Sequence, residues 1–222
     1  MTSIILVRHA ECEGNINNSL TGRTEFKLTR NGEEMAQDLL NELKKHKINA
    51  IYSSPSIRCI ETIRPTAKYF KLDINTCEGL LEKYFGIYDG MTWEEVKMRN
   101  PKITENKRKF NEIKGIPEQE TTKQVELRMK SCIQRIAKEN KGKTILICSH
   151  GCAIYSFLKS IDELKLNKEN KYSQSNAAIN RIEYENGKFT IIKINQINHL
   201  RKRNWRRDVQ YEKWPNYKIF SA

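Results

Sequence analysis

Short, mostly apolar runs recur along the chain, at residues 4–7, 48–52, 72–76 and 144–148. Runs of this length that are rich in Ile, Val and Leu are typical of strands buried on both faces of a sheet. Most of them are followed by a longer stretch in which hydrophobic residues repeat at helical spacing. This alternation predicts parallel strands that are joined through helices.

The helical spacing is clearest over about 31–45 and over roughly 56–70. A third, short helix is predicted to begin at Thr92, which opens a capping-box sequence, and to stop before Pro101. Another capping-box sequence at 121–124 predicts the start of a helix that leads up to the last apolar run. A final helix is expected directly after that run.

Two further strands are predicted at 178–185 and 188–194, on either side of Asn186-Gly187, which is a strong hairpin signal. We therefore expect an α/β fold: a three-layer sandwich in which a mostly parallel sheet carries helices on both faces and this hairpin forms a late antiparallel edge. One domain is expected over 1–200, followed by a basic, aromatic C-terminal tail over 201–222. The polar residues of 102–120 are expected to form a lid or an insertion.

The composition is that of a globular protein of enzyme size, with 38% hydrophobic and 30% charged residues in 222. No apolar stretch approaches the roughly 20 residues of a membrane helix, and no signal peptide is expected, so a cytoplasmic location is the expectation. Six cysteines show neither a CxxC pair nor a zinc spacing and are expected to be reduced thiols. The net charge of +13 favours anionic partners.

The first and the last apolar runs each end in a histidine. Arg8-His9 follows residues 4–7, and Ser149-His150-Gly151 follows residues 144–148. Because open α/β sheets bind their ligands at the carboxyl ends of the strands, both imidazoles are predicted to lie at one ligand-binding edge. Two imidazoles beside an arginine suit phosphate chemistry, in which one attacks phosphorus and the other donates hydrogen bonds.

A longer set of motifs, taken in order, resembles the histidine phosphatase superfamily, the group of phosphoglycerate-mutase-like phosphatases and mutases. The resemblance covers the chain to about Leu200 and is highly specific as a set. It is carried by Arg8-His9-Ala10-Glu11, Asn15, Thr21-Gly22, Leu28-Thr29, Gly32, Ser53-Ser54-Pro55, Arg58, Glu82, Phe85-Gly86 and Ser149-His150-Gly151.

The resemblance implies that His9 is the nucleophile and is transiently phosphorylated. Arg8 and Arg58 would then bind the equatorial phosphoryl oxygens, and their charge would keep His9 neutral. It also implies that His150 donates a hydrogen bond to the same oxygens. Glu82 matches the general acid, with a pKa raised by its surroundings, that protonates the leaving group and then activates water.

Four further positions match substrate-binding residues of this family, and they are Asn15, Thr21, Gly22 and Gly151. No metal and no other cofactor is expected, since arginines and histidines supply the charge. The expected partner is a phosphorylated small molecule. Two departures from the family pattern, Ala10 for Gly and Cys12 for Ser or Thr, leave the nucleophile in place.

The choice between a phosphatase and a cofactor-dependent phosphoglycerate mutase rests on the segment after Glu82. Mutases of the family have a Tyr-Gly pair and a later Lys that binds substrate, and here Phe85 and Trp93 stand at those places. The first loop has Gly22-Arg23 where mutases have Gly-Trp. The sequence therefore favours a metal-independent phosphomonoesterase, with the mutase as the alternative.

A function of another class is motivated by the C-terminal tail, where basic residues alternate with aromatic ones. Such a segment can bind single-stranded nucleic acid or other anions. We favour the interpretation that its aromatic side chains dock on the protein's own core or on a partner subunit. Nucleic acid is therefore not expected as the main partner. The natural substrate and the oligomeric state stay open, a homo-oligomer included.

Overall fold

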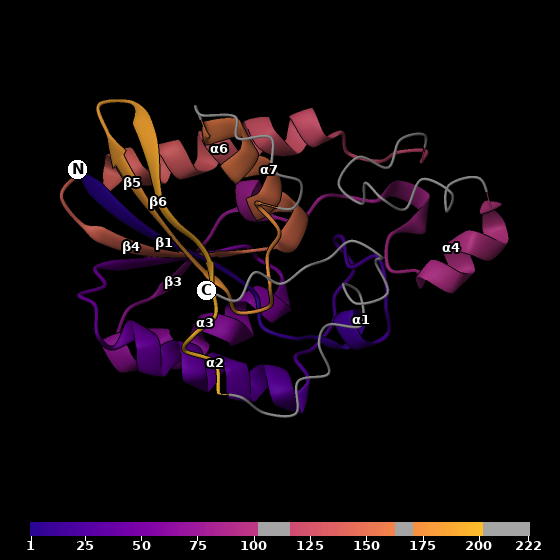
Figure 1. Ribbon diagram of the computed structural model, residues 1–222, viewed down its shortest axis with the longest axis horizontal. Helices are drawn as coiled ribbons and strands as arrows, with labels where there is room; N and C mark the ends of the chain where they lie inside the picture. Colours follow the sequence, from indigo (N-terminus) through magenta and orange to yellow (C-terminus); the bar gives the residue numbers. More distant parts are fainter. Residues whose placement is uncertain (102–115, 163–170, 202–222) are drawn as a thin grey trace.

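A computed structural model describes residues 1–101, 116–162 and 171–201 (Figure 1). Over these residues the chain forms one six-stranded sheet in the order β3-β2-β4-β1-β5-β6. The first four strands in that order are parallel, and β5 and β6 form an antiparallel edge. The strands are β1 (Thr2–Arg8), β2 (Ala50–Ser53), β3 (Ile74–Thr76), β4 (Thr144–Ser149), β5 (Ile179–Glu185) and β6 (Lys188–Gln196).

Helices connect the parallel strands, and short turns follow β3. The α-helices are α1 (Glu13–Ile16), α2 (Arg30–Leu43), α3 (Ile57–Phe70), α4 (Trp93–Arg99), α6 (Thr122–Glu139) and α7 (Gly151–Ile161). Two 3₁₀ turns, η1 (Glu78–Leu80) and η2 (Gly86–Tyr88), lie between β3 and α4. Both capping boxes predicted from the sequence form, with Thr92 and Thr121 as the N-caps of α4 and α6.

The two faces of the sheet are covered by different helices, as Figure 1 shows. Ile4 and Leu6 of β1 pack in one apolar cluster with α6 and α7. Ile5 and Val7, which alternate with them along the strand, pack in a second cluster with α2 and α3. Side chains of a strand point to alternate faces, so one continuous apolar run serves both layers. The α/β three-layer sandwich with a late antiparallel edge is thus confirmed.

The elements differ from the sequence-based expectations mainly at their ends. Helix α2 ends at Leu43 rather than about residue 45, and β2 begins at Ala50 rather than at 48. Of the expected lid, residues 102–115 lie outside the described residues, as does the tail beyond residue 201. The division into a domain over 1–200 and a tail therefore stays a prediction.

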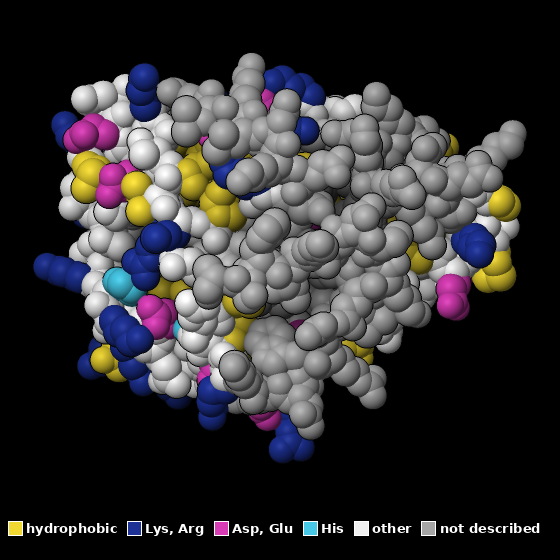
Figure 2. All heavy atoms as spheres, viewed as in Figure 1, with side chains coloured by type: hydrophobic (Ala, Val, Ile, Leu, Met, Phe, Trp, Pro, Cys, Tyr) yellow, Lys and Arg dark blue, Asp and Glu magenta, His cyan; other side chains and the backbone are white. Residues whose placement is uncertain are grey.

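On the face shown in Figure 2, the Lys and Arg side chains of the described residues are scattered, and carboxylates lie among them. These residues form no single basic patch in this view. The same described residues contain no helix that is long and apolar enough to cross a membrane.

Candidate active site

The register of β1 against β4 brings the two histidine motifs together. Arg8 lies opposite Ser149 in the parallel pair, and the N–H of His9 donates to the carbonyl of Ser149 (2.9 Å). The next residue in each chain segment is therefore a histidine at the carboxyl end of the sheet. The ring centroids of His9 and His150 are 5.3 Å apart and the rings meet edge to face, inclined by 63°.

The ring of His9 is fully enclosed and has one hydrogen bond that settles its tautomer. Its Nδ1 lies 2.8 Å from the carbonyl oxygen of Ala10, and because a carbonyl only accepts, Nδ1 carries the proton. Burial, and then the positive charges of Arg58 and Arg8, lower the pKa of His9 well below 6.5. A neutral imidazole with Nδ1–H has its lone pair at Nε2, which is the form that can attack phosphorus.

His150 is buried at the N-terminus of α7 with both ring nitrogens engaged. Its Nδ1 accepts from Nε of Arg58 (3.3 Å), so the proton lies on Nε2, which is 2.8 Å from the hydroxyl oxygen of Ser54. Burial, and then the charge of Arg58, lower the pKa of His150 well below 6.5. In this neutral tautomer Nε2–H can donate a hydrogen bond to a bound anion in place of the one that it makes with Ser54.

Arg58 is the most enclosed cation of the site, with 0% of its surface exposed at the start of α3. Its guanidinium donates to three backbone carbonyls of one loop, those of Thr21 (3.0 Å), Gly22 (2.6 Å) and Thr24 (2.9 Å). Within the described residues no carboxylate forms an ion pair with it. Its charge therefore acts on its surroundings. It adds to burial in lowering the pKa values of His9 and His150, and it opposes the rise that burial causes in the pKa of Glu82.

Arg8 and Gly151 form the side of the site nearest the sheet. Arg8 is 4% exposed, and its Nη1 donates to the carbonyl of Gln174 (2.7 Å). A Cβ at Gly151 would lie 3.4 Å from Nε of Arg8, so the guanidinium packs directly against the first residue of α7. Arg8 thereby places a second positive charge beside His9.

Glu82 lies under the N-terminus of α7 and is held there by backbone N–H groups. Its Oε1 accepts from Lys83 (2.8 Å) and Ala153 (2.9 Å), and its Oε2 accepts from Cys152 (3.0 Å). Burial raises its pKa, although these N–H groups and the charge of Arg58 act in the opposite direction. Since Oε2 accepts only one of the three N–H groups, it is the oxygen with room for a proton.

The predicted substrate-binding residues of the first loop have structural partners of their own. Asn15 Oδ1 accepts from the N–H of Cys12 (3.1 Å) and from Nδ2 of Asn176 (3.0 Å). The carbonyls of Thr21 and Gly22 accept from Arg58, as described. A Cβ at Gly22 would lie 1.9 Å from Oδ2 of Asp89, so glycine is required where that carboxylate approaches the loop.

Several residues that shape the site were not singled out from the sequence. Asp89 accepts from the backbone N–H groups of Arg23 (3.0 Å) and Thr24 (2.9 Å) and so holds the loop over Arg58. Thr62 accepts from the N–H of Ala10 (2.8 Å). Arg128, paired with Glu120, binds the backbone carbonyl of Glu82. Each acts on a segment distant in the chain, and no local pattern identifies such a partner.

All five predicted catalytic residues, Arg8, His9, Arg58, Glu82 and His150, thus come together at one end of the sheet. Across the described part of the chain, no three His, Cys, Asp or Glu side chains are placed to hold a metal ion.

The fold and this constellation define a histidine phosphatase. Residues 4–197 match the family model of the histidine phosphatase superfamily (branch 1), and the chain belongs to that superfamily. The enzyme class that the motifs predicted is therefore confirmed.

Among proteins of known name, the chain is similar to phosphoserine phosphatase 1 of Hydrogenobacter thermophilus, with 29% identity over 90% of this chain and 95% of that protein. Among solved structures, it resembles the phosphoserine phosphatase of Entamoeba histolytica in complex with 3-phosphoglyceric acid, with a TM-score of 0.75, 26% identity and coverage of 90% and 100% of the two chains. Bacillus stearothermophilus YhfR, at a TM-score of 0.81 and 23% identity over 90% and 99%, shares the fold.

Proposed function

We propose that this protein hydrolyses small phosphomonoesters through a phosphohistidine formed on His9. The observation that carries the proposal is the state of His9: a buried, neutral imidazole whose Nδ1–H donates to Ala10 and whose Nε2 lone pair is left for attack. Arg8 and Arg58 supply the positive charge that the transferring phosphoryl group needs.

In the first step, Nε2 of His9 attacks phosphorus and forms a P–N bond while the ester P–O bond breaks. The proton on Oε2 of Glu82 passes to the departing alkoxide, which leaves as an alcohol. Arg58 exchanges its neutral carbonyl partners for charged phosphoryl oxygens, with which guanidinium forms stronger, bidentate hydrogen bonds. His150 donates from Nε2 to the same oxygens.

In the second step, the Glu82 carboxylate takes a proton from water, and the water oxygen attacks phosphorus. The P–N bond breaks, inorganic phosphate leaves, and His9 and the protonated Glu82 are restored. The raised pKa of Glu82 supports both roles, because it favours the protonated carboxyl group that the first step needs and makes the carboxylate a better base in the second.

Phosphatase activity is favoured over mutase activity by two side chains after Glu82. Phe85 is 1% and Trp93 is 7% exposed, and both lie in one apolar cluster. They stand where the mutases of the family have a tyrosine and a lysine, so these two positions offer no charge to bind a second anionic group. The relatives named above make phosphoserine the first substrate to test.

The test is a rapid-quench measurement with phosphoserine and a generic aryl phosphate, without added metal, on the wild type and His9→Asn. We expect phosphate release and a base-stable, acid-labile phosphoryl adduct in the wild type, and neither in the variant. His46→Asn, away from the site, serves as the control and should behave as the wild type. Phosphate release that persists in His9→Asn would overturn the proposal. Isomerisation of 3-phosphoglycerate with a bisphosphate primer would show a mutase instead.

We also infer a cytoplasmic location, for which the support is that all six cysteines are free thiols, five of them buried. Cell fractionation that recovers the protein outside the cytoplasm would contradict this.

A further inference from the structure

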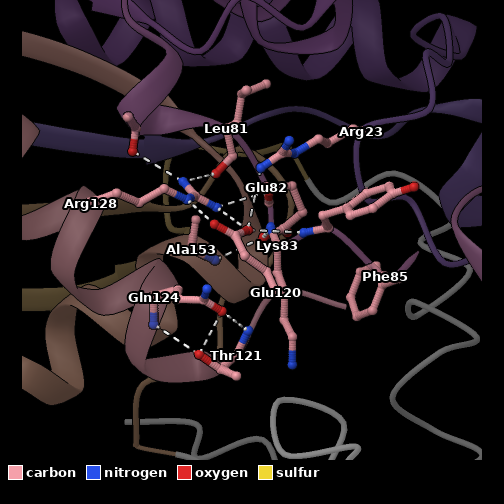
Figure 3. Close-up of polar contacts among 12 residues, drawn as sticks. Arg23, Leu81, Glu82, Lys83, Phe85, Glu120, Thr121, Gln124, Arg128 and Ala153 are labelled. Carbon is pink, nitrogen blue, oxygen red and sulfur yellow. Dashed lines mark hydrogen bonds and ion pairs between the residues drawn. The ribbon is translucent and has the colours of Figure 1, made fainter. Parts of the chain in front are cut away.

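Arg128, on α6, donates hydrogen bonds to the short segment that carries Glu82 (Figure 3). Its Nη1 reaches the carbonyls of Gly79 (3.1 Å) and Leu81 (2.6 Å), and its Nη2 reaches the carbonyl of Glu82 itself (3.0 Å). The backbone bonds of this segment close its own turn, from Leu80 and Leu81 back to residues 77 and 78. Neighbouring elements also reach the segment at single carbonyls, through Ser149 Oγ to Leu80 (2.8 Å) and the N–H of Glu120 to Tyr84 (3.0 Å). The guanidinium of Arg128, by contrast, binds three carbonyls of the segment at once.

The guanidinium is itself fixed by Glu120, which lies just before α6. Nε of Arg128 is 2.6 Å from Oε1 and Nη2 is 2.9 Å from Oε2, a bidentate pairing that sets the plane of the guanidinium. Oε2 also accepts from the N–H of Tyr84 (3.1 Å). Burial alone would raise the pKa of Glu120, but the hydrogen bonds and charge of Arg128 lower it, so the pair is ionised.

Together the two side chains hold the segment on both sides of Glu82, at residues 79–82 through Arg128 and at Tyr84 through Glu120. The carboxyl group of Glu82 is then directed by α7, through the N–H groups of Cys152 and Ala153. The backbone of Glu82 thus depends on α6 and its side chain on α7. Displacement of the backbone would draw the carboxyl group away from these N–H groups and from the leaving-group oxygen.

We propose that Arg128, oriented by Glu120, is a positioning residue for the general acid Glu82. This inference rests on the proposed function, because it presupposes that Glu82 protonates the leaving group. Arg128 acts through the backbone carbonyls that it binds and through its pairing with Glu120. Its loss should therefore impair the proton transfer while leaving nucleophilic attack by His9 intact.

The experiment compares two substrates whose leaving groups differ in their need for a proton. An alkyl phosphate such as phosphoserine releases a strongly basic alkoxide, whereas 2,4-dinitrophenyl phosphate releases a weakly basic phenolate that needs no acid. We expect Arg128→Lys and Glu120→Gln to lower kcat for the alkyl phosphate by about 10²-fold, the size typical of a misplaced catalytic group. The rate with the dinitrophenyl ester should fall by less than about threefold, as expected for a step without acid catalysis.

Glu82→Gln is the reference variant and should show the same selectivity more strongly. Arg135→Lys is the matched control, because Arg135 lies two turns further along α6, is 57% exposed and pairs with Glu139. Its Nη2 lies 3.6 Å from Sγ of Cys77 and not at the carbonyls that Arg128 binds, so this variant should leave both rates unchanged. Thermal denaturation shows whether each variant is folded. If Arg128→Lys is unfolded, Glu120→Gln provides the test.

The outcomes distinguish failure of the positioning role of Arg128 from failure of the general-acid role of Glu82. Equal losses on both substrates, or no loss on the alkyl phosphate, in folded Arg128→Lys and Glu120→Gln would overturn the positioning role if Glu82→Gln remains selective. A Glu82→Gln variant without leaving-group selectivity would instead overturn the assignment of Glu82 and, with it, the basis of this inference.

Discussion

Two enclosed arginines, Arg58 and Arg128, donate to backbone carbonyls in similar ways but differ in how their charge is balanced. Arg58 binds three carbonyls of the first loop and Nδ1 of His150, and no carboxylate pairs with it in the part of the chain that the structure describes. Arg128 also binds three carbonyls, but its charge is met by the carboxylate of Glu120 at 2.6 Å.

The difference separates a cation that binds substrate from one that builds the site. A buried charge without an opposite charge is costly, so a protein retains one where an anion will bind. Burial, and then the charge of Arg58, accordingly lower the pKa values of His9 and His150 and keep both neutral. A charge that is already neutralised, like that of Arg128, is suited to holding backbone in place. Changes at Arg58 should therefore weaken transition-state binding for every substrate, whereas changes at Arg128 should lower stability and impair only the proton transfer from Glu82.

The largest effect is expected from Arg58→Gln, which should lower kcat/KM for a phosphomonoester by about 10²–10³-fold, or roughly 3–4 kcal/mol of transition-state stabilisation. Its free energy of unfolding should change much less, because losing the carbonyl partners is offset by removing a buried charge. Steady-state kinetics and urea denaturation measure the two quantities. An active Arg58→Gln enzyme would remove the distinction between the two arginines.

A smaller loss of activity, confined to substrates that need acid catalysis, is expected from Arg128→Gln, together with a loss of stability. The substitution leaves the carboxylate of Glu120 with only the more distant Arg23 (3.7 Å) as a cationic partner among the described residues. It also removes the donor of three carbonyls, and together these losses should cost about 3 kcal/mol of unfolding free energy. Urea denaturation measures it, with Arg135→Gln as the control, since an exposed, solvent-screened ion pair contributes little to stability. If Arg128→Gln were as stable as that control, the pair would not hold the segment.

The smallest effect concerns pH. His9 and His150 have folded-state pKa values well below 6.5, mainly through burial and then through Arg58. Their contribution to stability is therefore present above pH 6.5 and is lost as the pH falls through the folded-state values. Glu82, with a raised pKa, acts in the opposite direction: its contribution is present below 4.5 and is lost as the pH rises.

Because two histidines outweigh one carboxyl group, the unfolding free energy should fall between about pH 7 and pH 5. Arg58→Gln should reduce this slope, since its charge lowers the pKa of both histidines, and Arg128→Gln should reduce it less. Urea denaturation between about pH 7 and pH 5 measures this slope in each variant. A slope unaffected by Arg58→Gln would show that burial alone keeps the histidines neutral.

Much of the fold could be predicted because its signals are local. Apolar runs and helical spacing identified the strands and the longer helices to within a few residues, although not the four-residue helix α1. The capping boxes at Thr92 and Thr121 formed as expected. Hydrophobic periodicity is a property of consecutive residues and needs no knowledge of the partner. The same holds for His9 and His150, whose places at strand ends follow from the runs before them.

What the sequence determined by itself is therefore the order of the elements, the two faces of the sheet and the residues brought to its carboxyl edge. The tertiary structure alone decided which groups surround those residues. Segments distant in the chain are joined where Arg58 binds the carbonyls of the first loop, where Asp89 holds that loop, and where Arg128 binds the carbonyl of Glu82. Hydrogen bonds and charges act over a few ångströms of space, so only the folded chain brings these partners within reach.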